Sequence, residues 1–485
     1  MYIPLLSQYV FWLCIVACNV IADEPRFYSG EISVPTMGQI EMTLGISETD
    51  EGTFILLTVP VQGAKDIPLP ATYKQDGSLF AELPQAGLSF VLFENEERTK
   101  LTGELHQDLV IEIAFNRVEE NTELKRPQNP IGPFPYWEYE VTAQHPAGHL
   151  LQGTLTIPDG QGPFPCAVLI SGSGLQDRDE SLMGHKPFLV IADYLSRNGI
   201  AVLRYDDRGV GGSVVEDRET LTSATTADFA TDVSLMVQAV RNHAEIDALQ
   251  VGLIGHSEGG LIGPMVAVDD SKLAFVVMLA GPGVAGDELL PVQQALFLET
   301  SGADQELIDA LVHASMSLYE MMELGEDTQV VQEQLEELVA IQFEAQGIDV
   351  SEELFDQSVD EALKVMSSDW MQFFLFYDPA PTLAMLVCPV LALNGSKDVQ
   401  VEARQNLSAI ERVKTETGND ITIIELDGLN HLFQPATTGA VSEYGRIETT
   451  FDEEALSIIT SWVLEVTDGT PSIIKSRVLE VTDND

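Results

Sequence analysis

Short, uninterrupted apolar segments between residues 166 and 426 constrain the fold of this chain more than any other feature. Six of them have the length of a strand and end near Gly, Asp or Asn: Cys166–Ser171, Ala201–Tyr205, Val251–Gly255, Phe275–Ala280, Val390–Asn394 and Ile421–Leu426. A strand that is apolar throughout is typical of a sheet buried on both faces. Helix-compatible stretches such as Thr226–His243 lie between the segments. This alternation predicts an α/β fold, with a mainly parallel sheet flanked by helices.

Residues 291–385 interrupt the alternation. They are rich in Glu, Gln, Leu, Ala and Met and have the spacing of several amphipathic helices. Sites in open α/β sheets lie at the carboxyl ends of the strands. We therefore expect this insertion to be a helical cap over that edge, and a purely structural excursion is the alternative. The catalytic domain would then comprise 137–290 and 386–468, closed by a helix at 451–466.

The front of the chain has a different pattern. Apolar and polar residues alternate over residues 23–126, in segments such as Thr53–Val59 and Leu88–Phe93, with turn residues at short spacing. This predicts a small β-rich N-terminal domain, an antiparallel barrel or sandwich. Four prolines between Pro127 and Pro135 predict a stiff connector over 127–136.

The two ends of the chain are expected to lie outside the folded domains. An apolar run from Val10 to Ala22 favours a signal peptide over residues 1–22 and export to the periplasm or beyond, although no Lys or Arg precedes it. In a second interpretation, Ile15-Val16-Ala17-Cys18 resembles the lipobox of bacterial lipoproteins, which would leave a lipid anchor on Cys18. Residues 469–485 are expected to form a mobile tail.

The charge balance limits the partners. The 485 residues include 77 acidic and 24 basic ones, for a net charge of −53. Nucleic-acid binding is excluded, because phosphates need clustered Lys and Arg. We hypothesise a salt-rich habitat, where screening weakens the self-repulsion. No metal or cofactor is expected, since Cys166 and Cys388 begin apolar runs and no metal-ligand spacing is present.

One motif carries the chemistry. Gly255-His256-Ser257-Glu258-Gly259 is a G-x-S-x-G sequence between the apolar run Val251–Gly255 and a helix-compatible stretch. This is the context of a nucleophile elbow, a strained turn that lifts a serine hydroxyl above the sheet and needs small neighbours. We therefore predict that Ser257 is a nucleophile.

A serine nucleophile needs a base and an acid that orients it, and in this fold the chain order is Ser, Asp or Glu, then His. Asp398 follows the predicted strand Val390–Asn394, and His431 follows Ile421–Leu426. Both therefore belong to the same edge of the sheet as Ser257. Asp427 is the second candidate for the acid, but it lies very close in sequence to His431.

Two backbone N–H groups should bind the oxyanion. One is expected from Glu258, the residue after the nucleophile. The other is expected from Ser173, in the loop Ser171-Gly172-Ser173-Gly174 that follows the first buried strand. The polar residues 176–180 and 185–186 come next, and for these we favour local pairing over substrate binding. The glycines at 209–212 do not have the spacing of a nucleotide-binding loop.

The combination of motifs resembles a known family. Ile170 to Asp179, Tyr205-Asp206-Asp207-Arg208-Gly209 and Gly255 to Gly260 are similar to segments of esterase-like bacterial α/β hydrolases, relatives of serine aminopeptidases and prolyl oligopeptidases. The resemblance covers roughly residues 130–465, and includes the regions around Trp370, Asp398 and His431. It implies an α/β-hydrolase fold and esterase activity on short acyl esters.

The sequence thus predicts an exported serine esterase that acts on a small-molecule ester through an acyl-enzyme and needs no cofactor. Two alternatives remain open at this stage. The first is a serine aminopeptidase, another peptidase or a thioesterase. The second is a binding protein with a vestigial hydrolase domain, which the complete set of Ser257, Asp398 and His431 disfavours. The sequence leaves the acyl chain length and the oligomeric state undetermined.

Overall fold

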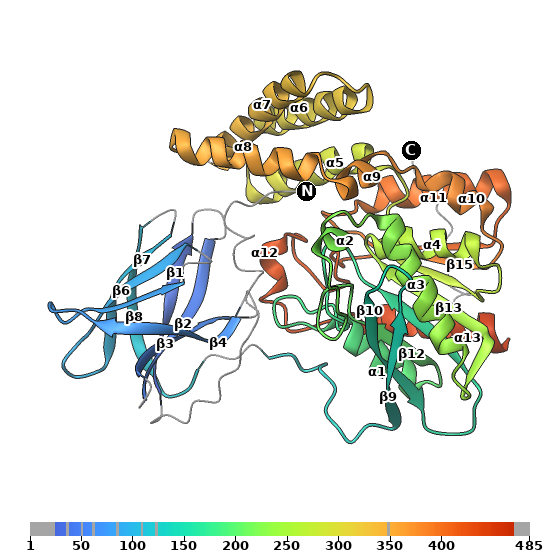
Figure 1. Cartoon of the computed structure of the whole chain (residues 1–485), viewed down its shortest axis with the longest axis horizontal. Coiled ribbons are helices and arrows are strands. Elements are labelled where there is room, and N and C mark those ends of the chain that lie inside the picture. Colours follow the sequence, from blue (N-terminus) through green and yellow to red (C-terminus); the bar gives the residue numbers. More distant parts are fainter. Residues whose placement is uncertain are drawn as a thin grey trace.

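The computed structural model describes residues 25–469, apart from 35–37, 50–51, 61–63, 84–86, 108–109, 122–124 and 347–349. Figure 1 shows three parts: a β-barrel, a sheet domain covered by helices, and a layer of helices along one side of the sheet domain. The predicted signal peptide and most of the predicted tail lie outside the described residues. Among the residues that are described, no helix is both long enough and apolar enough to span a bilayer.

The sheet domain has eight strands in the order β16-β15-β14-β13-β11-β12-β10-β9. The strands are β9 (Tyr136–Gln144), β10 (Leu150–Pro158), β11 (Phe164–Ile170), β12 (Ala201–Tyr205), β13 (Ile246–His256), β14 (Val276–Leu279), β15 (Val390–Gly395) and β16 (Ile421–Leu426). β10 runs antiparallel to both β9 and β12, and the other neighbouring strands are parallel. The predicted parallel sheet is confirmed.

Strands β9 and β10 had no counterpart among the predicted strands. β9 forms an edge of the sheet and is exposed or partly exposed at every residue after Tyr136, whereas β10 alternates between buried and partly exposed residues over its first six positions. They lack the continuous apolar run by which a strand buried on both faces is recognised in a sequence. That criterion therefore does not detect a hairpin whose edge strand is mostly exposed.

Helices cover both faces of the sheet. One apolar core joins it to α1 (Pro187–Arg197) and α13 (Glu453–Asp468), and another joins it to α3 (Thr226–Arg241), α4 (Gly259–Asp269) and α11 (Ala403–Thr417). Two short helices, α2 (Arg218–Thr222) and α12 (Val441–Tyr444), lie in loops. The strands are thus buried on both sides, as their continuous apolar runs predict.

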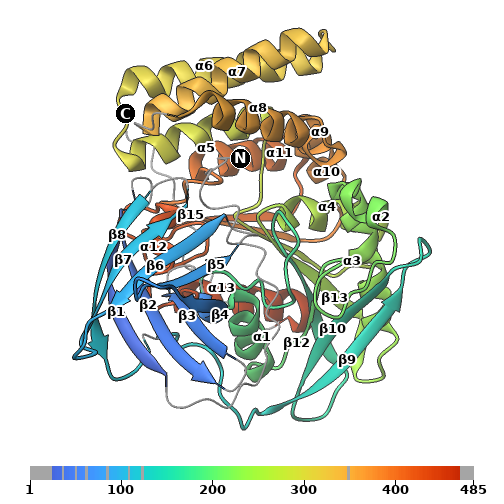
Figure 2. The same ribbon diagram turned by 60° about the vertical axis from the view of Figure 1, so that its left-hand side comes forward.

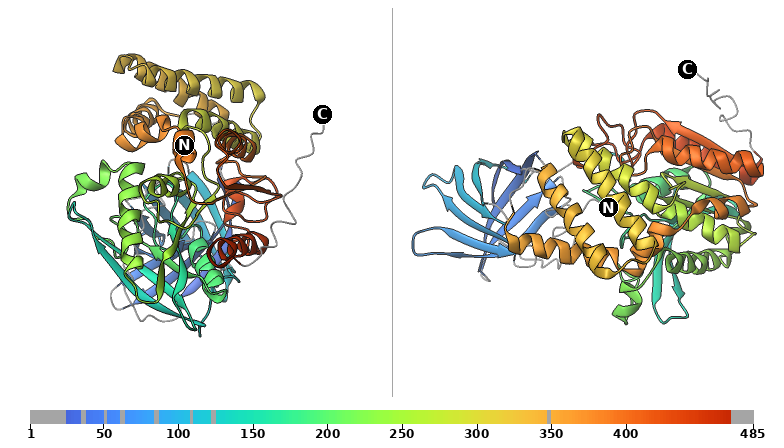
Figure 3. Two further views of the ribbon diagram at one scale, coloured as in Figure 1. Left: turned by 90° about the vertical axis from the view of Figure 1, so that its right-hand side faces the viewer. Right: turned by 90° about the horizontal axis from the view of Figure 1, so that it is seen from above.

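The insertion between β14 and β15 is helical, as predicted. Its helices are α5 (Gly286–Ser301), α6 (Gln305–Glu323), α7 (Thr328–Gln346), α8 (Glu352–Met366), α9 (Asp369–Phe376) and α10 (Pro379–Met385). Helices α5 to α9 share a core that also includes Leu261 and Val401 of the sheet domain. Figure 3 shows these helices lying across the sheet domain, with α8 extending toward the barrel.

The N-terminal domain is a closed antiparallel barrel of eight strands in sequential order. The strands are β1 (Arg26–Val34), β2 (Gly38–Thr49), β3 (Gly52–Val59), β4 (Ala64–Tyr73), β5 (Leu79–Leu83), β6 (Leu88–Glu94), β7 (Lys100–His106) and β8 (Val110–Val118). Apolar side chains fill the interior, among them Tyr28, Phe90 and Phe115. An eight-stranded barrel is just wide enough for its own side chains to fill it.

The segment between the two domains is held by the sheet domain. Arg126 donates to the backbone oxygens of Met183, Gly445 and Ile447. Gln128 accepts from the N–H groups of Thr450 and Phe451 and donates to the Phe451 oxygen. Figures 1 and 2 show the barrel on the side of the sheet domain where α12 lies.

Candidate active site

Ser257 lies in the turn between β13 and α4. Its φ is +54°, in the left-handed region that a residue with a side chain rarely adopts. Its N–H donates to the oxygen of Leu279 on the neighbouring strand β14, at 2.8 Å. Backbone strain of this kind persists only where the surrounding structure enforces it, and it marks functional positions. The serine has the geometry that the G-x-S-x-G motif predicts.

Glycines make this turn sterically feasible. A Cβ added to Gly255 would lie 1.9 Å from the oxygen of Gly259, and one added to Gly259 would lie 2.3 Å from the oxygen of Ile170. A Cβ on Gly172 would contact the Ser257 Cβ at 3.1 Å. This last contact places the loop after β11 directly beside the serine.

Asp398 and His431 form a buried pair. Nδ1 of His431 lies 2.8 Å from Oδ2 of Asp398, and the two residues are 4% and 3% exposed. The other carboxylate oxygen of Asp398 accepts the N–H groups of Gln400 and Val401. Because the carboxylate accepts, the proton of a neutral His431 lies on Nδ1, and Nε2 keeps its lone pair. Such an imidazole can accept a proton from a hydroxyl.

His256, the residue before Ser257, contacts His431 and so places the pair of Asp398 and His431 beside the turn of the nucleophile. The ring of His256 lies 4.8 Å from the ring of His431, centroid to centroid, and His256 Nε2 is 3.0 Å from the His431 backbone oxygen. A Cβ on Gly395 would lie 2.2 Å from the oxygen of Leu429, so the loops after β15 and β16 are closely packed. The structure thus brings Ser257, Asp398 and His431 to one edge of the sheet.

The two predicted oxyanion donors lie at the same edge. Glu258 precedes the first turn of α4, where free backbone N–H groups and the helix dipole favour negative charge. Ser173 is an exposed residue of the loop that contains Gly172. N–H groups from both segments are placed to stabilise the negative oxygen that forms when Ser257 attacks a carbonyl group.

The side chain of Glu258 has a role that the sequence did not indicate. It is 3% exposed, and its Oε1 accepts from Thr226 Oγ1 at 2.7 Å and from Trp370 Nε1 at 2.8 Å. Trp370 belongs to cap helix α9. Burial raises the pKa of this carboxyl, while the hydrogen bonds from Thr226, Trp370 and Ser173 oppose the rise. Glu258 therefore connects the elbow to the cap.

The charged side chains at 178–180 pair with groups of the protein, but their partners include residues that are distant in the sequence. Arg178 forms a salt bridge with Asp206, and Arg204 forms one with Asp179. Asp207 accepts from the Ser171 hydroxyl at 3.0 Å. Burial raises the pKa of Asp207 to about 8. These contacts tie the loop after β11 to the loop after β12 and so support the oxyanion segment.

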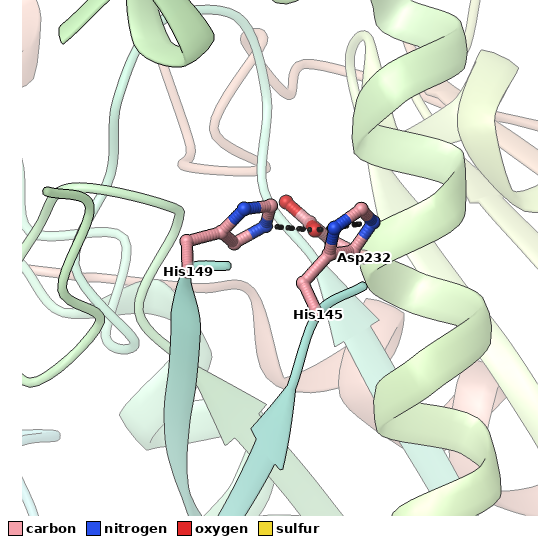
Figure 4. A group of neighbouring side chains, drawn as sticks. All are labelled: His145, His149 and Asp232. Carbon is pink, nitrogen blue, oxygen red and sulfur yellow. Dashed lines mark hydrogen bonds and ion pairs between the residues drawn. The ribbon is translucent and has the colours of Figure 1, made fainter. Parts of the chain in front are cut away.

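One group of side chains has potential metal ligands. His145, His149 and Asp232 bring three donor atoms within 4.8 Å of one another. The two imidazoles are stacked, however, with 13° between their planes, so their in-plane lone pairs do not converge on one point. The second oxygen of Asp232 accepts from Arg208 at 2.7 Å. Figure 4 shows His145, His149 and Asp232 side by side. We interpret this group as a hydrogen-bonded link between the β9–β10 hairpin and α3, and not as a metal site.

Comparison with known proteins finds a hydrolase family model and a named relative. Residues 186–339 match the family model described as "Serine aminopeptidase, S33". The chain is also 28% identical over 288 residues to the protein named "Esterase EstD" from Thermotoga maritima. Over this part of its length, the chain is therefore similar in sequence to serine hydrolases. The match covers 58% of this chain and 58% of the Thermotoga protein, so the chain spans little more than half the length of that relative.

Solved α/β-hydrolase structures show a more distant likeness. The α/β hydrolase GrgF from Penicillium sp. sh18 is 17% identical, with a TM-score of 0.38 over 61% of this chain and 91% of that one. The Pyrococcus furiosus esterase Pf2001 is 15% identical, with a TM-score of 0.40 over 72% of this chain and 99% of the other.

Proposed function

We propose that this chain is a serine hydrolase that cleaves carboxylic esters, with short acyl chains, through an acyl-enzyme. The observation that carries the proposal is the buried hydrogen bond between His431 Nδ1 and Asp398 Oδ2, next to the strained Ser257 turn. The similarity to a protein named as an esterase supports the choice of ester substrates.

The proposed reaction has two halves. His431 Nε2 takes the proton of Ser257 as its Oγ attacks the ester carbonyl, and the oxyanion is held by the N–H groups of Glu258 and Ser173. Collapse of this intermediate expels the alcohol, which receives the proton from His431 and leaves an acyl-serine. Water then attacks the acyl-serine with His431 again as base, releasing the carboxylic acid. Asp398 holds the required tautomer and stabilises the imidazolium.

A peptidase is the second candidate, since the matching family model describes a serine aminopeptidase. An aminopeptidase needs an anionic group to bind the substrate's ammonium. Two acidic side chains close to Ser257 are already engaged by the protein: Glu258 by Thr226 and Trp370, and Glu180 by His256. This engagement favours an ester over a peptide with a free N-terminus.

The test compares the mature protein with Ser257→Ala on p-nitrophenyl acetate, butyrate and octanoate, beside an aminoacyl β-naphthylamide and a thioester. We expect ester turnover that decreases with chain length and falls by at least about a thousandfold in the variant. A faster rate on the naphthylamide or the thioester would contradict the ester assignment. If neither protein turns over any substrate and Ser257 does not react with a fluorophosphonate, the chain is a binding protein instead.

We further propose that the chain is exported. The apolar segment Val10–Ala22 supports removal of a signal peptide, and the segment ending in Cys18 supports a lipid anchor as the alternative. Mass spectrometry of the N-terminal peptide from cells distinguishes the two. A peptide beginning at Asp23 supports cleavage, a diacylglyceryl group on Cys18 supports the anchor, and an intact Met1 would contradict both.

A further inference from the structure

A second histidine lies beside the proposed catalytic pair. His256 precedes Ser257 and is 6% exposed. Its Nδ1 lies 2.9 Å from Glu180 Oε1, and its Nε2 lies 3.0 Å from the backbone oxygen of His431. A carboxylate and a carbonyl oxygen can only accept, so both contacts are hydrogen bonds only if both ring nitrogens carry hydrogen. An imidazole with two N–H groups is an imidazolium.

We propose that His256 is a buried imidazolium, paired with Glu180, that positions both His431 and the oxyanion loop. This inference rests on the function proposed above. Through Nε2, His256 holds the backbone of the proposed general base. Glu180 Oε1 also accepts the N–H of Gly172, at 3.0 Å, and Gly172 adjoins Ser173. One ion pair thus connects the turn of the nucleophile, the base and the loop of an oxyanion donor. His256 is a positioning residue and does not itself contact the substrate.

The backbone of Glu180 supports this assignment. Its φ is +52°, although it is not a glycine, and it is 6% exposed. Residues with side chains are held in this region only where the structure around them enforces it, and such positions gather at functional sites. The strained conformation directs a carboxylate into the interior, where an unpaired charge would be strongly unfavourable. The imidazolium supplies the opposite charge.

The charged and titratable groups that face His256 come from three loops. Glu180 belongs to the loop after β11, Asp398 to the loop after β15, and His431 to the loop after β16. Burial by itself lowers the pKa of His256, but the charge and hydrogen bond of Glu180 outweigh it, so that the pKa is raised above 6.5. The imidazolium therefore persists to higher pH than in a free histidine and is lost as the pH rises through the raised pKa.

This direction predicts a loss of activity at high pH. A neutral His256 keeps its remaining hydrogen on Nδ1, facing the Glu180 carboxylate, because this is the stronger acceptor. Its Nε2 then loses the hydrogen bond to the His431 oxygen. We expect kcat/KM to fall on the alkaline side as the charge of the pair is lost and His431 is held less firmly.

The decisive measurement is the nitrogen spectrum of the full chain labelled with ¹⁵N-histidine, recorded against pH. At pH 7, we expect His256 to show two protonated ring nitrogens. His185 is an internal control, since it is also buried, its Nδ1 faces the Thr450 hydroxyl at 2.9 Å, and burial lowers its pKa to about 4. It should carry a single proton. A His256 with one protonated nitrogen at pH 7 would overturn the proposal.

Two variants test the positioning role. In Glu180→Gln, the amide can donate to a neutral His256, so we expect about a tenfold loss of kcat/KM and no alkaline fall linked to His256. In His256→Gln, we expect kcat to fall roughly ten- to a hundredfold with little change in KM, because misplacement affects the reaction more than binding. His313→Gln, an exposed histidine on α6, serves as the matched control and should match the wild type.

The outcomes separate this inference from the proposed function. If the wild type neither hydrolyses esters nor labels with a fluorophosphonate, the proposed function fails, while the nitrogen spectrum still decides whether the ion pair exists. If the wild type is active and His256→Gln keeps full kcat and the wild-type pH profile, the esterase stands and the positioning role is overturned.

Discussion

Buried acids distinguish the surroundings of Ser257 at the scale of single residues. Glu258, Asp207 and Asp206 are all largely buried close to the site, yet their pKa values shift in different directions. The direction of each pKa shift depends on the group that the carboxyl faces. Asp206 faces the guanidinium of Arg178, whereas Asp207 accepts from neutral groups such as the Ser171 hydroxyl. The two neighbouring carboxyls, Asp206 and Asp207, thus change the stability of the fold in opposite directions as the pH rises.

Asp207 should make the fold less stable as the pH rises. Its folded pKa is about 8, because burial disfavours its charge, whereas an unfolded aspartate titrates near 4. Between these values the folded chain holds a proton that the unfolded chain has released, so the free energy of unfolding falls as pH increases. We expect Asp207→Asn to remove this fall, so that the variant gains stability relative to the wild type from pH 5 to 9 in urea melts.

Asp206→Asn is the matched control for that experiment. Burial raises the pKa of Asp206, but its hydrogen bonds from Arg178 and Gly212 outweigh burial, and the net shift is downward. Its ion pair therefore stabilises the fold above the unfolded pKa and is lost on acidification. We expect Asp206→Asn to be less stable than the wild type at pH 7, with the difference shrinking below about pH 4. Parallel behaviour of the two variants would contradict both assignments.

The carboxyl of Glu258 should be needed as an acceptor and not as a charge. Glu258→Gln keeps an oxygen for Thr226 and Trp370, so we expect its ester hydrolysis to stay within a few fold of the wild type. Glu258→Ala leaves two buried donors unpaired, at a cost of about 1–3 kcal/mol each. Urea unfolding and p-nitrophenyl butyrate kinetics measure both effects. Equal losses in the two variants would show that the charge matters instead.

Contacts between elements decide how the site is assembled. Cap helix α9 reaches the elbow through Trp370, whose ring also stacks on Phe374 at 5.5 Å. The cap shares an apolar core with Leu261 of α4, the helix that begins at the elbow. The cap and the elbow are therefore joined both by apolar packing and by one buried hydrogen bond.

Trp370→Phe removes that hydrogen bond while keeping an aromatic ring. We expect kcat/KM on p-nitrophenyl butyrate to fall about tenfold, because Glu258 loses a donor and the residue next to the nucleophile is less firmly held. Trp137→Phe is the control, since Trp137 is 64% exposed on the edge strand β9. A Trp370→Phe enzyme as active as the control would show that the cap contact does not affect the chemistry.

The segment between the domains should contribute to the stability of the sheet domain. Gln128 makes three hydrogen bonds to Thr450 and Phe451, in the loop that precedes α13. Gln128→Ala leaves these backbone groups without their partner, and we expect a loss of about 1–3 kcal/mol in the free energy of unfolding. Gln305→Ala, an exposed residue on cap helix α6, should be neutral. A neutral result for Gln128→Ala would mean that water replaces its hydrogen bonds.

Excess negative charge is the dominant property at the scale of the whole molecule. With a net charge of −53, the folded chain repels itself, and compaction brings these charges closer together. Dissolved ions screen such repulsion over about 10 Å at 0.1 M. The salt-rich habitat inferred from the composition remains a hypothesis.

Added salt should therefore stabilise the protein. We expect the Tm to rise as NaCl increases from low concentration to about 0.5 M, with most of the change complete once the Debye length is below 5 Å. Sucrose at equal osmolality is the control for effects other than screening. A Tm that falls with NaCl, or rises equally with sucrose, would contradict self-repulsion as the cause.

Much of the fold could be predicted from local patterns. The six buried strands appear as continuous apolar runs, and the barrel strands as alternation between turn residues. That Ser257, Asp398 and His431 lie at one edge of the sheet could also be predicted, from the chain order and the ends of the predicted strands. By contrast, β9 and β10 were not predicted, because the mostly exposed edge strand β9 and the alternating strand β10 have no continuous apolar run.

By itself, the sequence determined the class of fold, the helical insertion and the three residues proposed for catalysis, because each leaves a signal within a few neighbouring positions. Only the tertiary structure decided which groups pair. His256 is 76 residues from Glu180, and Trp370 is 112 residues from Glu258. A hydrogen bond between distant residues depends on how strands and helices pack, so no local pattern records it. The protonation of His256 and the link between cap and elbow follow from those contacts.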